Sequence, residues 1–120
     1  KDFDRQPGYL AHGPAVPILL PVWDKKVEKE PWRTIWQLAA NCLRQAKSLI
    51  IWGYSLPLTD LKAQALFRVC LCAEDSVLEN VCVIDPNGDT RARWRSSFLK
   101  QRFWPYEKIH DFLEKPPEWW

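Results

Sequence analysis

The sequence contains no methionine, only four glycines and no long run of apolar residues. No apolar stretch approaches the ~20 residues that a membrane-spanning helix needs, so no such helix is expected. Because even a starting methionine is missing, we expect a processed protein, or a fragment or subunit of something longer. Lys and Arg number 17 against 15 for Asp and Glu. So small an excess gives no reason to expect a nucleic-acid or membrane partner.

The sequence also lacks paired cysteines of the kind that bind zinc. Its four cysteines, Cys42, Cys70, Cys72 and Cys82, include no Cys-x-x-Cys pair, so we expect no structural metal site. Each lies in a strongly apolar stretch, which favours buried, reduced thiols over disulfides. Reduced thiols are typical of the cytoplasm, and we therefore expect a cytoplasmic protein.

Tryptophan is abundant, with eight residues among 120, and hydrophobic residues make up 47% of the chain. That composition is ordinary for a folded protein and too apolar for a disordered one. Trp rings are costly to expose, so several of them must pack in the core or against a partner. The chain is long enough for one domain at most, with a modest core.

The chain divides into three parts by composition. Residues 1–31 form a Pro-rich, extended lead-in. Within it, the short apolar run at residues 16–22 could be a strand, and its prolines restrict it to an edge strand or an extended segment. Residues 32–102 alternate between helical and strand patterns, and residues 103–120 form an aromatic tail with a short helix at 107–114. The middle part is therefore the expected folded unit.

The middle part predicts an α/β fold. The expected elements are a helix over 32–47, a strand over 48–53, a helix capped by Thr59 or Asp60, a strand over 80–84 and a helix over 90–99. Both strands are apolar throughout, which is typical of parallel strands buried on both faces. We predict a partial doubly wound, Rossmann-like parallel sheet. Two strands are too few for such a sheet, so a missing segment or a partner chain is expected to complete it.

Ligands of doubly wound sheets bind at the carboxyl ends of the strands. Here those ends carry Gly53 and Ser55 after the first strand and Asp85 after the second. Glycine lets a backbone approach a ligand closely, a hydroxyl can contact phosphate or ribose oxygens, and a carboxylate can accept hydrogen bonds from ribose hydroxyls. The same residues are also common in plain turns, so by themselves they leave ligand binding open.

Three segments together resemble a known family. They are residues 50–61 (Ile-Ile-Trp-Gly-Tyr-Ser-Leu-Pro-Leu-Thr-Asp-Leu), 66–68 (Leu-Phe-Arg) and 81–87 (Val-Cys-Val-Ile-Asp-Pro-Asn). This pattern resembles the C-terminal half of sirtuin-like (silent-information-regulator-like) domains, and within them the bacterial branch that hydrolyses NAD. The resemblance covers roughly residues 14–100, and its most specific block is the Gly-Tyr-Ser-Leu-Pro-x-x-Asp motif.

The resemblance implies roles for individual residues. Gly53 and Ser55 match residues that line the nicotinamide-ribose and phosphate side of NAD, and Asp85 matches a position near the adenine ribose. His12 looks like the family's general base in NAD cleavage, although a solvated loop histidine is the alternative. Asp60 matches the acidic residue of the motif, but an Asp at a helix start also stabilises the helix without any ligand. Tyr54 is expected to pack rather than to catalyse.

What the family has and this sequence lacks refines the expected function. The zinc-binding cysteine pairs of the deacetylases in this family are missing, which favours NAD hydrolysis without a metal. The resemblance links such hydrolysis to bacterial anti-phage defence. The Gly-rich phosphate loop is missing too, so the chain alone is expected to be inactive. It then needs an N-terminal half or a partner chain. The alternative is a degenerate half-domain that binds other proteins.

Two further features point to partners. The aromatic tail has side chains suited to a protein interface, or it covers the sheet; its rings are Phe103, Trp104, Tyr106, Trp119 and Trp120. A basic run, which contains Arg91, Arg93, Arg95, Lys100 and Arg102, suits nucleic acid or a solvated helix face. The small net charge favours the solvated face, so direct contact with nucleic acid is not expected.

Overall fold

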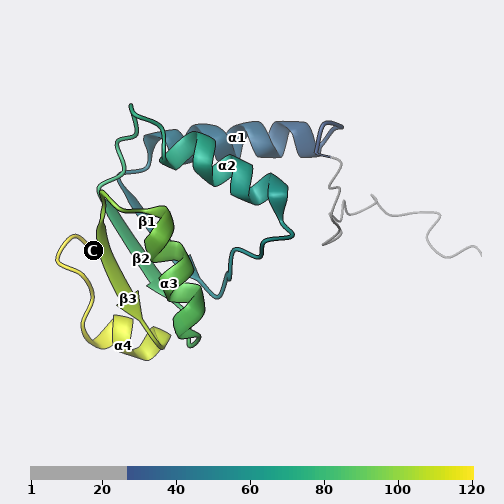
Figure 1. Ribbon diagram of the computed structural model, residues 1–120. Helices are drawn as coiled ribbons and strands as arrows, with labels where there is room; N and C mark the ends of the chain where they lie inside the picture. The colour runs from purple at the N-terminus through teal and green to yellow at the C-terminus, as the bar shows by residue number, and fades with distance from the viewer. Residues whose placement is uncertain (1–26) are drawn as a thin grey trace, which may run out of the picture.

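The computed structural model describes residues 27–120. The strand candidate at 16–22 and His12 lie outside them. Seven elements follow in the order α1 (Trp32–Gln45), β1 (Ser48–Trp52), α2 (Leu61–Leu71), β2 (Asn80–Ile84), α3 (Gly88–Ser97), β3 (Arg102–Tyr106) and α4 (Ile109–Glu114). The strands form one parallel sheet in the order β1-β2-β3 (Figure 1). The prediction of an α/β fold with a parallel sheet is confirmed, and the arrangement is consistent with part of a Rossmann-like fold.

The two predicted strands are present, and the sheet gains a third. Strand β3 pairs with β2 in parallel, with Val83 opposite Pro105. No strand was expected here, since residues 103–120 were assigned to the aromatic tail. Proline is tolerated here because β3 is the outer strand, where fewer backbone N–H groups are needed for pairing.

The start of α3 differs from the prediction. The helix begins at Gly88 and not at Thr90. The reason is Asn87, whose side-chain oxygen accepts a hydrogen bond from the backbone N–H of Asp89 at 2.9 Å. An Asn at this position satisfies a backbone donor that the first turn of a helix leaves free.

Each face of the sheet has its own core. On one face, Ile51, Val81 and Val83 pack against α2 and α3. From α3 the core receives the rings of Trp94 and of Phe98, the C-cap residue. On the other face, a smaller cluster joins residues of β2 and β3 to α4 and the C-terminal segment; it contains Cys82, Ile84, Phe112, Trp104, Tyr106, Ile109 and Trp119. Successive side chains of a strand point to opposite faces of the sheet, so neighbouring residues of β2 belong to different clusters. The aromatic tail therefore covers the second face of β2 and β3.

Strand β1 is not buried on both faces as expected. Ile51 is buried against α2 and α3, whereas Ile50 is 37% and Trp52 68% exposed on the opposite face. The small cluster around Phe112 stops at β2 and β3. Among residues 27–120, no element covers this side of β1, and none pairs with its outer edge.

Helix α1 begins at the predicted residue, ends at Gln45 rather than near Lys47, and has no fully buried residue. It contacts α2 (Figure 1), while its apolar residues Ile35 and Leu38 remain largely exposed. Its periodic apolar pattern predicted the helix correctly, and its apolar stripe is only half-buried, with Ala40 and Leu43 packed against the core. No helix in the described part of the chain is both long and apolar enough to cross a membrane.

The cysteine prediction is half correct. All four thiols are free, and Cys70 and Cys82 are buried, but Cys42 and Cys72 are exposed. Cys42 lies on α1, whose surface is not covered, and Cys72 follows the last residue of α2, where the chain leaves the core. Burial raises the pKa of Cys82 to about 11, as expected for a thiol that loses contact with water.

Candidate functional site

The loops that follow β1 and β2 begin side by side at the carboxyl edge of the sheet. The last paired residues of the two strands are Trp52 and Ile84. Beyond them, the backbone N–H of Gly53 donates to the carbonyl oxygen of Ile84 at 3.0 Å, and that of Asp85 donates to the carbonyl oxygen of Tyr106 at 3.1 Å. These hydrogen bonds extend the ladder by one step and bring Gly53 and Asp85 to the same edge.

Gly53 is required by the backbone and not by crowding. Its φ is +69°, and a Cβ placed on it would meet no atom of residues 27–120 within 4 Å. Residues with a Cβ rarely adopt that φ, whereas glycine adopts it without steric strain. The open space beside it is available to a ligand that approaches the backbone. Three residues on, Leu56 also has a positive φ, of 50°, a strained conformation that costs of order 1–3 kcal/mol and is often found at functional sites.

Helix α3 holds the loop after β1 in place. The indole Nε1 of Trp94 donates to the carbonyl oxygen of Tyr54 at 2.7 Å, and Nη1 of Arg93 donates to the carbonyl oxygen of Ser55 at 2.8 Å. The main chain of this loop is therefore fixed from α3, while the side chain of Ser55 is exposed. Because the backbone of this loop is fixed and the hydroxyl of Ser55 is exposed, the loop is preorganised to contact a ligand.

Tyr54 and Asp60 are structural residues. The Tyr54 hydroxyl donates to Oδ2 of Asp60 at 3.0 Å, and Oδ1 of Asp60 accepts from the backbone N–H of Ala63 at 3.2 Å. The ring of Tyr54 packs beside Phe67 and Trp94, and burial raises its pKa to about 12. The helix-capping interpretation of Asp60 and the packing role of Tyr54 are confirmed.

Asp85 is buried, and part of its carboxylate shapes its own loop. Oδ1 accepts a hydrogen bond from the backbone N–H of Asn87 at 2.8 Å, as Asp commonly does in turns. The main-chain oxygen of Asp85 accepts a hydrogen bond from Arg91. Within residues 27–120, Oδ2 has no such partner, so this oxygen keeps its full capacity to accept hydrogen bonds.

The structure brings together three of the four site residues that the sequence singled out. Gly53, Ser55 and Asp85 lie in the two adjacent loops, and His12 lies outside the described residues. His110 is exposed and faces Glu114 at 3.0 Å on α4, in agreement with the prediction of a surface position. No group of three His, Cys, Asp or Glu side chains between residues 27 and 120 is arranged to hold a metal ion.

Sequence reasoning missed the role of the basic residues of α3. Arg91 and Arg93 bind the two candidate loops, and the guanidinium of Arg95 lies 5.3 Å from the ring centre of Phe103. These three arginines therefore make intramolecular contacts. A useful signal was available in Trp94, because a large ring in a charged helix indicates that one helix face is buried.

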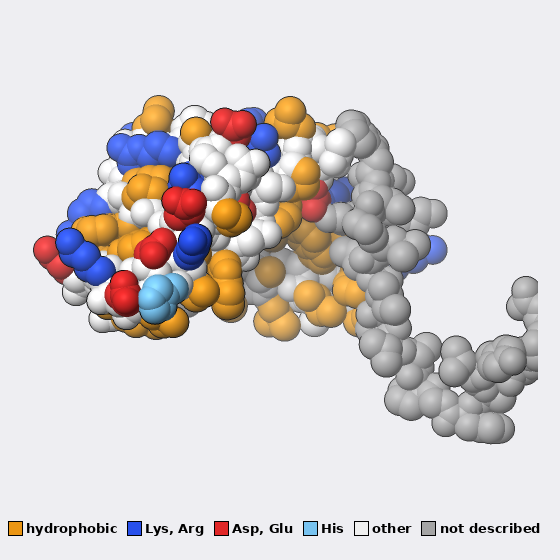
Figure 2. Space-filling view, turned by 90° about the horizontal axis from the view of Figure 1, so that it is seen from below, with side chains coloured by type: hydrophobic (Ala, Val, Ile, Leu, Met, Phe, Trp, Pro, Cys, Tyr) orange, Lys and Arg blue, Asp and Glu red, His pale blue; other side chains and the backbone are white. Residues whose placement is uncertain are grey.

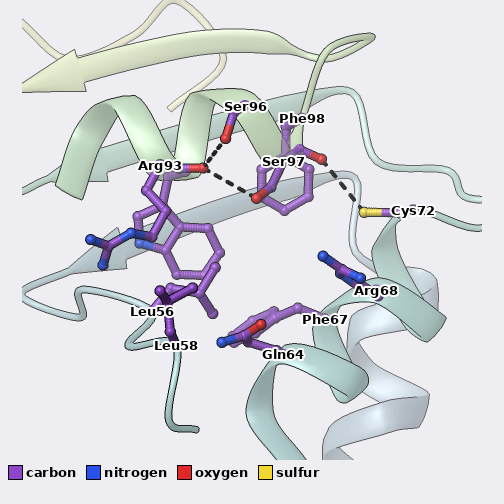
Figure 3. A pocket seen from close by; sticks show the side chains of 11 residues that line it. Leu56, Leu58, Gln64, Phe67, Arg68, Cys72, Arg93, Ser96, Ser97 and Phe98 are labelled. Atoms are coloured by element: carbon purple, nitrogen blue, oxygen red, sulfur yellow. Dashed lines mark hydrogen bonds between the residues drawn. The ribbon is translucent and has the colours of Figure 1, made fainter. Parts of the chain in front are cut away.

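A cavity that the described residues form lies away from the sheet edge. It measures about 500 Å³ and lies between α2 and α3 (Figure 3). Leu56 and Arg93 line it, but Gly53, Ser55 and Asp85 do not.

Comparisons of the chain with models of protein families, with curated proteins and with solved structures found no match.

Proposed function

We propose that this chain is the C-terminal part of a sirtuin-like domain that binds NAD and hydrolyses its nicotinamide–ribose bond. One observation carries the proposal. Gly53 and Asp85 stand side by side at the carboxyl edge of two neighbouring parallel strands, where nucleotides bind in sheets of this type. In the proposal, Gly53 and Ser55 contact the nicotinamide-ribose and phosphate side of NAD, and Asp85 accepts a hydrogen bond near the adenine ribose.

The exposed side of β1 supports the idea that a further segment completes the sheet. Both the outer edge of β1 and the face with Ile50 and Trp52 are uncovered by residues 27–120. A parallel strand normally has helices on both faces and neighbours on both edges when it lies inside a doubly wound sheet. We propose that an N-terminal half, in the same protein or in a partner chain, supplies that cover together with the Gly-rich phosphate loop. The isolated chain is then inactive.

His12 is the proposed general base, because a histidine titrates near neutral pH. NAD is a substrate in this proposal, and no metal takes part. The four free thiols support a cytoplasmic location. The resemblance to the bacterial branch suggests anti-phage defence by depletion of cellular NAD as the biological role.

The proposal is tested by producing the chain together with the protein segment encoded immediately before it. Release of nicotinamide and ADP-ribose from NAD is then measured by chromatography. We expect hydrolysis by the assembly and none by the 120-residue chain. Ser55→Ala and Asp85→Ala should each reduce the rate about tenfold or more, because one hydrogen bond to a charged or polar ligand group is removed.

Matched controls use the same residue types away from the sheet edge. Ser76→Ala and Asp75→Ala change residues of the loop between α2 and β2 and should leave the rate unchanged. If the assembly binds NAD but the Ser55 and Asp85 variants hydrolyse it normally, the assigned residues are wrong. If the assembly neither binds nor cleaves NAD, the enzymatic proposal is overturned.

The alternative proposal is a degenerate half-domain that serves as a protein-interaction module. The exposure of Trp52 at 68% favours it, because large aromatic side chains often anchor interfaces. Figure 2 shows several places where hydrophobic side chains come to the surface between charged ones. This alternative requires that the assembly forms but does not bind NAD, which the same experiment measures.

A further inference from the structure

The cavity between α2 and α3 is not lined by Gly53, Ser55 or Asp85, the residues proposed to contact NAD. Its volume of about 500 Å³ falls within the range of small-molecule sites, roughly 300–1,000 Å³. Leu56 and Leu58 from the loop after β1 close one end. The opposite walls come from α2 and α3 (Figure 3). The site does not depend on the proposed NAD chemistry.

The base of the cavity is apolar and held rigidly. Trp94 and Phe98 are fully buried and stack with ring centres 6.0 Å apart, while Phe67 meets Trp94 edge-on at 5.2 Å. The indole N–H of Trp94 is engaged by Tyr54, so it presents no free donor to the cavity. Phe67 is only half-buried and Leu58 is exposed. These two side chains are therefore the apolar surface that a ligand ring would contact.

The charged lining of the cavity is entirely positive. Two of its eleven lining residues are arginines, Arg68 and Arg93, and none is Asp or Glu. Arg93 already donates to the carbonyl oxygen of Ser55. Arg68 makes no hydrogen bond or ion pair with another residue of 27–120, and Figure 3 shows its guanidinium group at the cavity between α2 and α3. A guanidinium that makes no hydrogen bond or ion pair within residues 27–120 and lies beside an apolar wall favours a planar anionic group.

The remaining polar side chains restrict where the anion can lie. The hydroxyls of Ser96 and Ser97 both donate to the carbonyl oxygen of Arg93, at 2.7 and 3.2 Å, so they are not free donors. Gln64 donates one amide hydrogen to the carbonyl oxygen of Pro57 at 2.8 Å and retains a second. The donors that remain for an anion are therefore those of Arg68 and Gln64 on α2, together with the unused N–H groups of Arg93 on α3.

We propose that this cavity binds a small aromatic molecule that carries one carboxylate or phosphate group. The ring lies against Phe67 and Leu58, and the anionic group binds the guanidinium of Arg68, with the amide of Gln64 one helical turn away. Neither the ring contact nor the ionic contact is large alone, so both are required for measurable affinity.

Binding is tested on the 120-residue chain by ligand-observed NMR titration with three probes of similar size. Phenyl phosphate and benzoate carry the two anionic groups, and benzyl alcohol is the neutral counterpart. We expect at least one anion to bind about tenfold or more tightly than benzyl alcohol, the difference that one charge-assisted contact provides. The tighter of the two anions identifies the preferred group.

Variants locate the site. Arg68→Gln removes the charge and should weaken anion binding about tenfold. Leu58→Asp, at an exposed position, places a carboxylate at the rim and should abolish anion binding. Arg102→Gln removes one positive charge from β3, away from the cavity, and should change nothing. The proposal is overturned if neither anion binds at millimolar concentration, if benzyl alcohol binds equally well, or if Arg68→Gln has no larger effect than Arg102→Gln.

Discussion

At the scale of single residues, the loop after β1 depends on backbone conformations that only some residues tolerate. Gly53 and Leu56 both have positive φ, but for different reasons. No atom of residues 27–120 lies close enough to Gly53 to obstruct a Cβ, so among these residues its main-chain angle restricts the residue type. Leu56 accepts the strain because its side chain is buried in the core cluster of α2 and α3, where it gains apolar contacts.

Replacement of Gly53 by alanine is expected to destabilise the protein by about 1–2 kcal/mol, because an L-residue is strained at a φ of +69°. The free energy of unfolding is measured by urea titration. Gly88→Ala is the matched control, since Gly88 lies in the first turn of α3 and a Cβ there meets only the end of the Arg91 side chain, at 3.6 Å. Equal costs for the two variants would contradict this account of the loop.

Sequence reasoning succeeded at residues with local partners. Asp60 caps the helix that starts one residue later, and an Asp before an apolar periodic run signals such a cap. The arginines of α3 could not be assigned in this way. Arg93 contacts Ser55, 38 residues earlier in the chain, and no local pattern encodes a partner at that separation.

At the scale of elements, the C-terminal segment is part of the fold and not an appendage. Strand β3 extends the sheet, and α4 follows with Phe112 facing the second side of the sheet. The Phe112 ring meets Tyr106 and Trp120 edge-on, with ring centres 5.5 and 5.2 Å apart. A helix of only six residues has little stability of its own, so this packing must hold it.

Phe112→Ala is expected to reduce the free energy of unfolding by about 3–4 kcal/mol, because it removes a large buried ring and leaves a cavity. The neighbouring Leu113→Ala should cost little, since Leu113 is 66% exposed whereas Phe112 is 3% exposed. Both variants are compared by thermal and urea unfolding. A small effect of Phe112→Ala would show that α4 does not contribute to the stability of the sheet.

The helices and the strands β1 and β2 were predictable at this scale, but β3 was not. Apolar periodicity marks α1 and α2, and a run of β-branched residues marks β2. In β3 the sequence Arg-Phe-Trp-Pro-Tyr contains a proline and a charge. Only the presence of β2 beside it makes these residues a strand, because pairing with a neighbour outweighs weak local propensity.

At the scale of the whole molecule, the two halves of the sheet differ in how well they are covered. The β2–β3 half has helices or aromatic side chains on both faces. The β1 half has an exposed apolar face and, within residues 27–120, an unpaired outer edge. Unpaired apolar edges promote association with other chains.

The isolated chain is therefore expected to self-associate through β1 as its concentration rises. Ile50→Lys should weaken this association about tenfold or more, because a charge on an edge strand opposes edge-to-edge pairing. Leu99→Lys adds the same charge at an exposed site after α3 and should have little effect. Sedimentation velocity measures both. A wild-type chain that stays monomeric at all concentrations would contradict the prediction.

The sequence by itself determined the α/β class, the parallel pairing of β1 with β2, and the loops where Gly53, Ser55 and Asp85 lie, because hydrophobic period and turn residues are local properties. Only the tertiary structure decided that β3 joins the sheet, that Trp94 and Arg93 hold the loop after β1, and that Ile50 and Trp52 are uncovered. Burial and long-range hydrogen bonds depend on which elements come together in space, and the order of residues along the chain does not specify that directly.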